Sequence, residues 1–373
     1  MRKLQFFVML LLLVMAMAGC QKQFYHVSEE AQTTFIGSER NVMYEIVLIG
    51  DSGAPHTKKP DPIIKMLDKK VREMGDNSAV VFLGDNIYPN GLPDSTKKLY
   101  EQSRNRIDVQ LSALEYYTGN IFFIPGNHDW NDGKKRGWKY LQNQEQYVES
   151  RLDAGDTFIP DNGEPGPVVK TLNDSLVLVA LDTQWWLQKH QKPKNLTQQQ
   201  VIDSLELVLE THKDRQIFVA GHHPLYSNGT HGGKLPPSTH LKPPVFGSLY
   251  VLYRKWFGLD QDITHKPYTN MQEKLTELLQ QYDNIVYASG HDHNLQYIPK
   301  NRNGNSQHYL ISGSASKQRY VKKGGQADFV TNLPGFMKLT YYKSGPVELE
   351  AWIHKEEEGE KSVFRKVIYS KDN

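Results

Sequence analysis

Short apolar runs separated by polar segments form the clearest pattern along the chain. Near-continuous apolar runs of this length predict strands that are buried on both faces. Six such runs are present. One of them, 176–181, is followed directly by Asp182 and predicts a core strand. The other five end in Gly and then a side chain with an oxygen or nitrogen donor: 44–49 before Gly50-Asp51, 79–83 before Gly84-Asp85, 121–125 before Gly126-Asn127, 217–220 before Gly221-His222 and 285–289 before Gly290-His291.

Segments with helical spacing of apolar residues lie between these runs. We predict helices over 61–74, 197–209 and 271–282, with Thr197 as a candidate N-cap. Alternating strands and helices favour an α/β layered fold, a β-sheet sandwich flanked by helices. Open α/β sheets gather their ligands at the carboxyl ends of the strands, so we expect the donors that follow the strands to share one site.

Two further segments depart from this alternation. Residues 232–270 are rich in Pro, Tyr, Trp and His and lack a clear apolar period. We predict an irregular insertion loop there that partly covers the site, because long irregular loops are often functional lids. Residues 335–369 alternate apolar and polar side chains, which predicts edge or packing strands. The expected main domain is 44–345, with the strands of 346–373 packed on it.

The N-terminus has the features of an export signal. Arg2 and Lys3 precede a mostly apolar run over 4–17 that is short for a membrane span, and Ala18-Gly19-Cys20 follows. This pattern resembles a bacterial lipoprotein signal, which predicts loss of 1–19 and a lipid-anchored Cys20 in the cell envelope. A plain signal peptide with an incidental Cys is the alternative. The polar residues 20–43 are predicted to form a tether.

Composition and charge narrow the class of partners. Removing Arg2 and Lys3 from 44 basic residues leaves 42, which equals the 42 acidic residues. A balanced charge gives no electrostatic reason to propose nucleic acid as a partner. Cys20 is the only cysteine, so no intrachain disulfide can form.

The donors after the strands indicate a metal site. Carboxylate, amide and imidazole groups suit iron, zinc and manganese. The shortage of cysteine argues against a structural zinc site. Two metals held about 3.5 to 4 Å apart need a bridging ligand, and a carboxylate can span them.

The ordered motifs resemble those of the calcineurin-like metallophosphoesterases. They are Gly50-Asp51-Ser52-Gly53, Gly84-Asp85-Asn86-Ile87-Tyr88, Gly126-Asn127-His128-Asp129, Gly221-His222-His223-Pro224 and Gly290-His291-Asp292-His293. Tyr88, three residues after Asp85, narrows the resemblance to the purple acid phosphatases, and 290–297 is similar to the tartrate-resistant acid phosphatases of that group. The resemblance covers roughly 44–320. Those small enzymes usually carry a disulfide and lack an insertion at 232–270.

The resemblance implies a role for each residue of the site. Asp51, Tyr88 and His293 would bind Fe(III). Asn127, His222 and His291 would bind a divalent ion, which is iron, zinc or manganese. Asp85 would bridge both metals. His128 would contact phosphate and donate a proton to the leaving group, with Asp129 orienting it, and His231 would face substrate.

Three functions follow as hypotheses. The first is hydrolysis of phosphate monoesters by a metal-bound hydroxide, as in purple acid phosphatases. The second is a phosphodiesterase or nucleotide pyrophosphatase on the same scaffold. The third is a surface binding protein with an idle metal site. The complete ligand set argues against the third, and Tyr88 favours the first.

Overall fold

The computed structural model describes residues 23–29, 31, 41–193, 196–241 and 246–369. The predicted export signal and Cys20 lie outside the described residues. Among the described residues, none of the helices combines the length and the apolar character that crossing a membrane requires.

Two β-sheets form the centre of the fold. The eight-stranded sheet has the order β1-β11-β9-β10-β8-β7-β6-β5, and the six-stranded sheet has the order β14-β13-β12-β2-β3-β4. The strands of the first sheet are β1 (Tyr25–Val27), β5 (Val168–Asn173), β6 (Leu176–Ala180), β7 (Gln216–Ala220), β8 (Ile285–Ser289), β9 (Leu295–Arg302), β10 (Asn305–Ser312) and β11 (Phe329–Thr331). Those of the second are β2 (Val42–Ile49), β3 (Ser78–Phe82), β4 (Asn120–Phe123), β12 (Gly335–Tyr342), β13 (Val347–Lys355) and β14 (Gly359–Tyr369).

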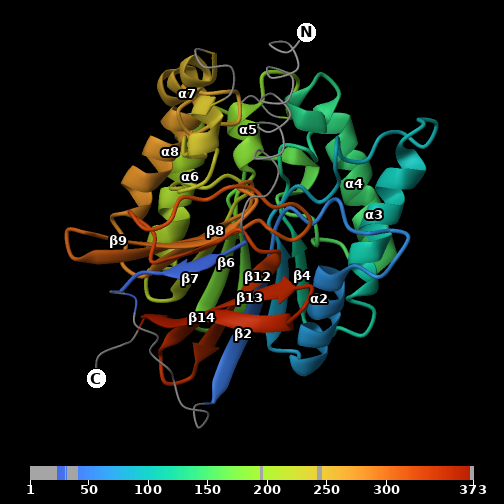
Figure 1. Ribbon diagram of the computed structural model, residues 1–373. Helices are drawn as coiled ribbons and strands as arrows, with labels where there is room; N and C mark the ends of the chain where they lie inside the picture. The colour runs from blue at the N-terminus through green and yellow to red at the C-terminus, as the bar shows by residue number, and fades with distance from the viewer. Residues whose placement is uncertain (1–22, 30, 32–40, 194–195, 242–245, 370–373) are drawn as a thin grey trace.

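Helices cover the outer faces of the sheets (Figure 1). In Figure 1, α6, α7 and α8 lie on one side of the molecule, and α2, α3 and α4 lie on the other. The helices are α2 (Pro62–Glu73), α3 (Tyr100–Ser112), α4 (Gly137–Leu152), α5 (Thr183–Leu187), α6 (Gln198–Thr211), α7 (Phe246–Trp256) and α8 (Lys266–Leu279). This four-layer arrangement confirms the predicted α/β sandwich flanked by helices.

The packing of β2 explains why the predicted strands are nearly continuous in apolar residues. Ile46 and Leu48 point into the core between the two sheets. Their neighbours Val47 and Ile49 point the other way, into the core beneath the helices that cover the six-stranded sheet. Successive side chains of a strand alternate between faces, so a strand covered on both faces needs apolar residues at every position.

The helix predictions are confirmed with small shifts. Asp61 caps α2 by accepting hydrogen bonds from the backbone amides of Ile63 and Ile64. Thr197 caps α6, and its side chain and that of Gln200 form a reciprocal capping box. Helix α8 begins at Lys266, five residues before the apolar period becomes visible at Met271, with Pro267 in its first turn.

Three segments differ from the prediction. The insertion 232–270 is not irregular, because it contains the 3₁₀ helix Pro237–Leu241, all of α7 and the start of α8. The predicted tether includes β1, which pairs with β11 at the edge of the eight-stranded sheet. The strand β12 is not an edge or packing strand, since it pairs with both β2 and β13 inside the six-stranded sheet.

Candidate metal centre

The loops that follow β2, β3, β4, β7 and β8 meet at one edge of the two sheets. Three of the residues that begin these loops have left-handed backbone angles: Asp51 (φ 57°), Asp85 (φ 55°) and His291 (φ 68°). Such angles are uncommon outside Gly and cluster at functional sites. Close approach of the loops also requires the preceding glycines. A Cβ on Gly126 would lie 2.3 Å from the amide nitrogen of Asp85.

Asp85 stands between two groups of donors. Its Oδ2 lies 3.0 Å from the hydroxyl of Tyr88. Its Oδ1 lies 3.4 Å from Nε2 of His222 and accepts a hydrogen bond from the His128 amide at 2.9 Å. The two carboxylate oxygens therefore face different donor groups, which is the arrangement that a bridging ligand needs.

The first group of donors surrounds the hydroxyl of Tyr88. Oδ1 of Asp51 lies 2.8 Å from this hydroxyl, and Nε2 of His293 lies 3.1 Å from it. The phenol has one proton, whereas the carboxylates of Asp51 and Asp85 both present acceptors to it. A cation in this position would satisfy all four groups together.

The second group consists of Asn127, His222 and His291. Oδ1 of Asn127 lies 3.1 Å from Nε2 of His222 and 3.2 Å from Nδ1 of His291. The two ring nitrogens are 3.3 Å apart. The other ring nitrogens face backbone carbonyls, with Nδ1 of His222 2.8 Å from Leu83 O and Nε2 of His291 2.9 Å from Gln261 O.

These backbone contacts show that the second group fits a metal. A carbonyl oxygen accepts a hydrogen bond from the ring N–H that faces it, which fixes the tautomer in which the other ring nitrogen carries a lone pair. The lone pairs of His222 and His291 and the carbonyl oxygen of Asn127 then point at one another. Three acceptors at this spacing repel unless a proton or a metal ion lies between them. The donor set of nitrogen and oxygen suits iron, zinc or manganese.

Burial and charge shift the pKa values of the cluster. Burial raises the pKa of Tyr88 well above its ordinary value, and Asp51 and Asp85 raise it further, so the phenol remains protonated without a metal. Burial would also raise the pKa of Asp85, but His222 and His128 outweigh it, and the pKa is lowered. Burial lowers the pKa of His291, and the neighbouring His231 lowers it further, which favours the neutral ligand form.

His128 lies at the rim of the cluster. Its ring packs edge-on against Tyr88 with centroids 4.5 Å apart, and its Nε2 lies 3.9 Å from Oδ2 of Asp85. Its Nδ1 contacts the carbonyl oxygen of Pro89, which leaves Nε2 free to face a ligand. The side chain is 25% exposed, so the ring can be reached from solvent.

Asp129 does not have the predicted role of orienting His128. It is fully buried and accepts hydrogen bonds from the amides of Asn86, Ile87 and Gly126. The carboxylate thus ties the loop after β3 to the loop after β4. The ring of His128 is oriented by the carbonyl oxygen of Pro89 instead.

Residues of the insertion 232–270 contact the second group of donors and its neighbours. Gln261 provides the carbonyl that holds His291, and its side-chain Oε1 lies 2.9 Å from Nε2 of His223. Asp262 lies 3.1 Å from Nδ1 of His231, whose ring faces that of His291 with centroids 4.1 Å apart. The predicted residue His231 is therefore brought to the site. His223 could be counted as a ligand, but both of its ring nitrogens have partners, since Nδ1 faces Thr183 Oγ1 at 2.7 Å.

We expect Asp262→Ala to lower the free energy of unfolding by about 3–5 kcal/mol, because the buried Arg254 loses its partner. Asp262 is fully buried and accepts from Nε of Arg254 at 2.7 Å. Burial would raise the pKa of Asp262, but His231 and Arg254 lower it overall. The stabilisation is therefore present at neutral pH and is lost as the pH falls through the lowered pKa. Urea denaturation at several pH values measures the change.

Asp260→Ala is the matched control for this prediction. Asp260 belongs to the same segment and pairs with Lys189 at 2.8 Å, but its side chain is 69% exposed. Exposed pairs contribute about 0–1 kcal/mol, so Asp260→Ala should change stability little. Equal losses in the two variants would contradict the assigned role of Asp262.

The sequence interpretation missed two cations beside the donors. Nζ of Lys317 lies 3.1 Å from the centroid of the Tyr88 ring. Nη1 of Arg319 lies 3.0 Å from Nε2 of His231. Both belong to the loop after β10, which ends at the same sheet edge as the ligand strands. The loop begins at Gly313, directly after β10, and this Gly after an apolar run was the available signal.

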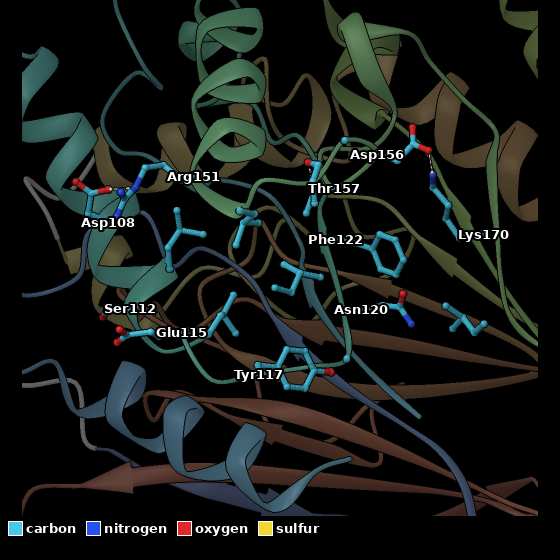
Figure 2. Close-up of a pocket in the computed structure, with 18 of the residues that line it drawn as sticks. Asp108, Ser112, Glu115, Tyr117, Asn120, Phe122, Arg151, Asp156, Thr157 and Lys170 are labelled. Carbon is cyan, nitrogen blue, oxygen red and sulfur yellow. Dashed lines mark hydrogen bonds and ion pairs between the residues drawn. The ribbon is translucent and has the colours of Figure 1, made fainter. Parts of the chain in front are cut away.

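A large cavity lies away from this centre. Figure 2 shows a cavity of about 840 Å³ beside Asn120 and Ile121, at the amino end of β4, whereas the donors follow the carboxyl ends of the strands. On its walls Arg151 pairs with Asp108 at 3.3 Å, and Lys170 pairs with Asp156 at 3.1 Å. We therefore place the chemistry at the donor cluster and not in this cavity.

Comparison with solved structures supports the architecture. Purple acid phosphatase PPD1 from yellow lupin (Lupinus luteus) superposes with a TM-score of 0.56 at 15% identity, covering 90% of this chain and 55% of that one. GAP50, described as the anchor in the inner membrane complex of Plasmodium, gives a TM-score of 0.54 at 19% identity, covering 89% and 90% of the two chains. At these identities the likeness concerns the fold alone.

Sequence comparison identifies the family. The chain is 25% identical over 346 residues to tartrate-resistant acid phosphatase type 5 of Mus musculus, covering 86% of this chain and 88% of that protein. It is 23% identical to purple acid phosphatase 17 of Arabidopsis thaliana over 306 residues, covering 80% and 75%. The family model described as calcineurin-like phosphoesterase matches residues 44–295. With the clustered donors, this match shows a metal-dependent phosphoesterase, and the chain belongs to the calcineurin-like phosphoesterase family.

Proposed function

We propose that the protein hydrolyses phosphate monoesters with a dinuclear centre of Fe(III) and a divalent ion, in the manner of purple acid phosphatases. The observation that carries this proposal is the hydroxyl of Tyr88, which lies 2.8 Å from Asp51, 3.0 Å from Asp85 and 3.1 Å from His293. A phenolate suits Fe(III), since a trivalent ion can offset the cost of ionising a group whose pKa is normally about 10.

The residues divide between the two metals as follows. Asp51, Tyr88 and His293 would hold Fe(III), and Asn127, His222 and His291 would hold iron, zinc or manganese, with Asp85 contacting both. When bound, the metals would neutralise charge on the phosphoryl oxygens and acidify a water molecule.

The remaining side chains would act on substrate. Nε2 of His128 faces the cluster and is suited to protonate the leaving alcohol, because Nδ1 is held by the Pro89 carbonyl. His231 lies on the side of the second metal, with Asp262 and Arg319 at its two ring nitrogens, and would act on substrate by positioning Arg319.

A panel of phosphate esters tests this proposal. We expect p-nitrophenol release from p-nitrophenyl phosphate at pH 5 to exceed that from bis-p-nitrophenyl phosphate by at least about tenfold in kcat/KM, with visible absorption from iron–phenolate charge transfer. A colourless enzyme that prefers diesters would contradict it and favour the phosphodiesterase or nucleotide pyrophosphatase hypothesis on the same scaffold.

We also propose that the protein is lipid-anchored in the cell envelope through Cys20. The support is the basic and apolar order of residues 2–17 followed by Ala18-Gly19-Cys20. Expression with a radiolabelled fatty acid should label the protein, and Cys20→Ala should remove the label. Equal labelling of the two forms would contradict the anchor.

A further inference from the structure

The loop that carries Lys317 and Arg319 is fastened to the metal centre. The amide of Ser316 donates to the carbonyl oxygen of Asp51 at 3.2 Å, and the amide of Arg319 donates to that of His293 at 2.7 Å. Oγ of Ser316 also accepts from the amide of Ala54 at 3.1 Å. Because the backbone is tied to two ligand-bearing loops, the positions of both cations follow the geometry of the site.

Lys317 lies beside the proposed Fe(III) ligands. Its ammonium group sits 3.1 Å from the centroid of the Tyr88 ring, and the side chain is half-buried. Among the described residues, no carboxylate lies within 4.0 Å of this ammonium group. Asp85 and Asp51 act on it from a longer distance. A half-buried lysine without a carboxylate partner is uncommon, because its desolvation is not compensated.

Arg319 lies beside the ligands of the second metal. Its Nη1 contacts His231 at 3.0 Å, and the ring of His231 faces the ring of His291. Within the part of the chain that the structure describes, its guanidinium also has no carboxylate within 4.0 Å. The residue as a whole is exposed to solvent. One of the two cations therefore lies beside each donor group, Lys317 at the first and Arg319 at the second.

Cations in these positions favour an anion between them and the metals. Two bound metal ions would offset the attraction that Asp51 and Asp85 exert on Lys317, and a negatively charged ligand in the shared space would attract both Lys317 and Arg319. A phosphate monoester can carry two negative charges, whereas a diester carries one. The additional charge of the monoester is the feature that two further cations would recognise.

Resting on the monoesterase function proposed above, we propose that Lys317 and Arg319 form a cationic rim that binds the second negative charge of a dianionic phosphate monoester and so selects monoesters over diesters. The rim consists of these two side chains on the loop after β10.

Kinetics with two substrates test the rim. We expect Lys317→Met and Arg319→Ala each to lower kcat/KM for p-nitrophenyl phosphate by about tenfold to a hundredfold, the range for loss of one charged hydrogen bond. kcat/KM for bis-p-nitrophenyl phosphate should change by less than about threefold. Lys317→Arg and Arg319→Lys should recover most of the monoester activity. Lys322→Ala is the matched control, since Lys322 is an exposed lysine of the same segment.

Calorimetry with inorganic phosphate provides a readout that does not depend on turnover. Lys317→Met and Arg319→Ala should raise the Kd for phosphate by about tenfold or more, with an unchanged metal content and melting temperature. Equal losses for both esters, or an unchanged Kd, would overturn the rim. If the wild type releases no p-nitrophenol from either ester, the proposed function fails, and phosphate binding alone then decides whether the rim exists.

Discussion

Asp85→Ala is expected to abolish phosphatase activity and to empty both metal positions. Asp85 presents one oxygen to the Tyr88 hydroxyl at 3.0 Å and the other to His222 at 3.4 Å, so its removal takes a ligand from each metal. We expect kcat to fall by at least about 10³-fold, equivalent to about 4 kcal/mol of transition-state stabilisation. Elemental analysis should give fewer than one metal ion per chain.

Asp182→Asn is the matched control for this loss. Asp182 is also fully buried, but it accepts from Nε1 of Trp130 at 2.8 Å, and Asn127, His128 and the other donors are not among its partners. Burial raises its pKa to about 7, so the amide resembles the form that the acid adopts near neutral pH. The control should keep both metals and most of the activity. Substantial turnover by Asp85→Ala would show that Asp85 does not bridge.

Tyr88→Phe is expected to remove the visible absorption band completely, because no other phenol oxygen belongs to the donor cluster of the described residues. The position proposed for Fe(III) would also lose a ligand. Changes to groups that only support a ligand cost about 10–100-fold in metal affinity or activity, so loss of the ligand itself should cost more than about 100-fold. Absorbance spectra and p-nitrophenyl phosphate kinetics on one preparation measure both effects.

Tyr341→Phe controls for the removal of a buried tyrosine hydroxyl. Tyr341 is 1% exposed, lies in β12, and its hydroxyl has no hydrogen-bond partner among the described residues. Its replacement should leave colour and activity unchanged. A Tyr88→Phe protein that retains its colour would mean that Tyr88 is not a metal ligand.

The sequence predicted the core strands and the convergence of their ends because these features follow from local patterns. Both faces of β2 over 46–49 and of β3 over 79–82 are covered, so these residues are apolar without interruption. The Gly that follows each strand marks a close approach of backbones, as at Gly126. The sequence pattern alone therefore predicts that seven donors, far apart in the chain, share one site.

The insertion could not be predicted in the same way. Its role depends on Asp262, which is fully buried by long-range packing and pairs with Arg254 eight residues earlier and with His231 thirty-one residues earlier. No apolar period marks these contacts. The insertion, which we expected to cover the site, also supports one of the donors, since the carbonyl of Gln261 orients His291. Asp129 was misassigned for a related reason, because proximity to His128 in sequence did not bring contact in space.

The most direct test of the two-metal centre is anomalous X-ray diffraction from crystals of the metal-loaded protein. We predict two peaks about 3.5 to 4 Å apart, one bounded by Asp51, Tyr88 and His293 and the other by Asn127, His222 and His291, with Asp85 in contact with both. A single peak, or metal bound away from these side chains, would contradict the account.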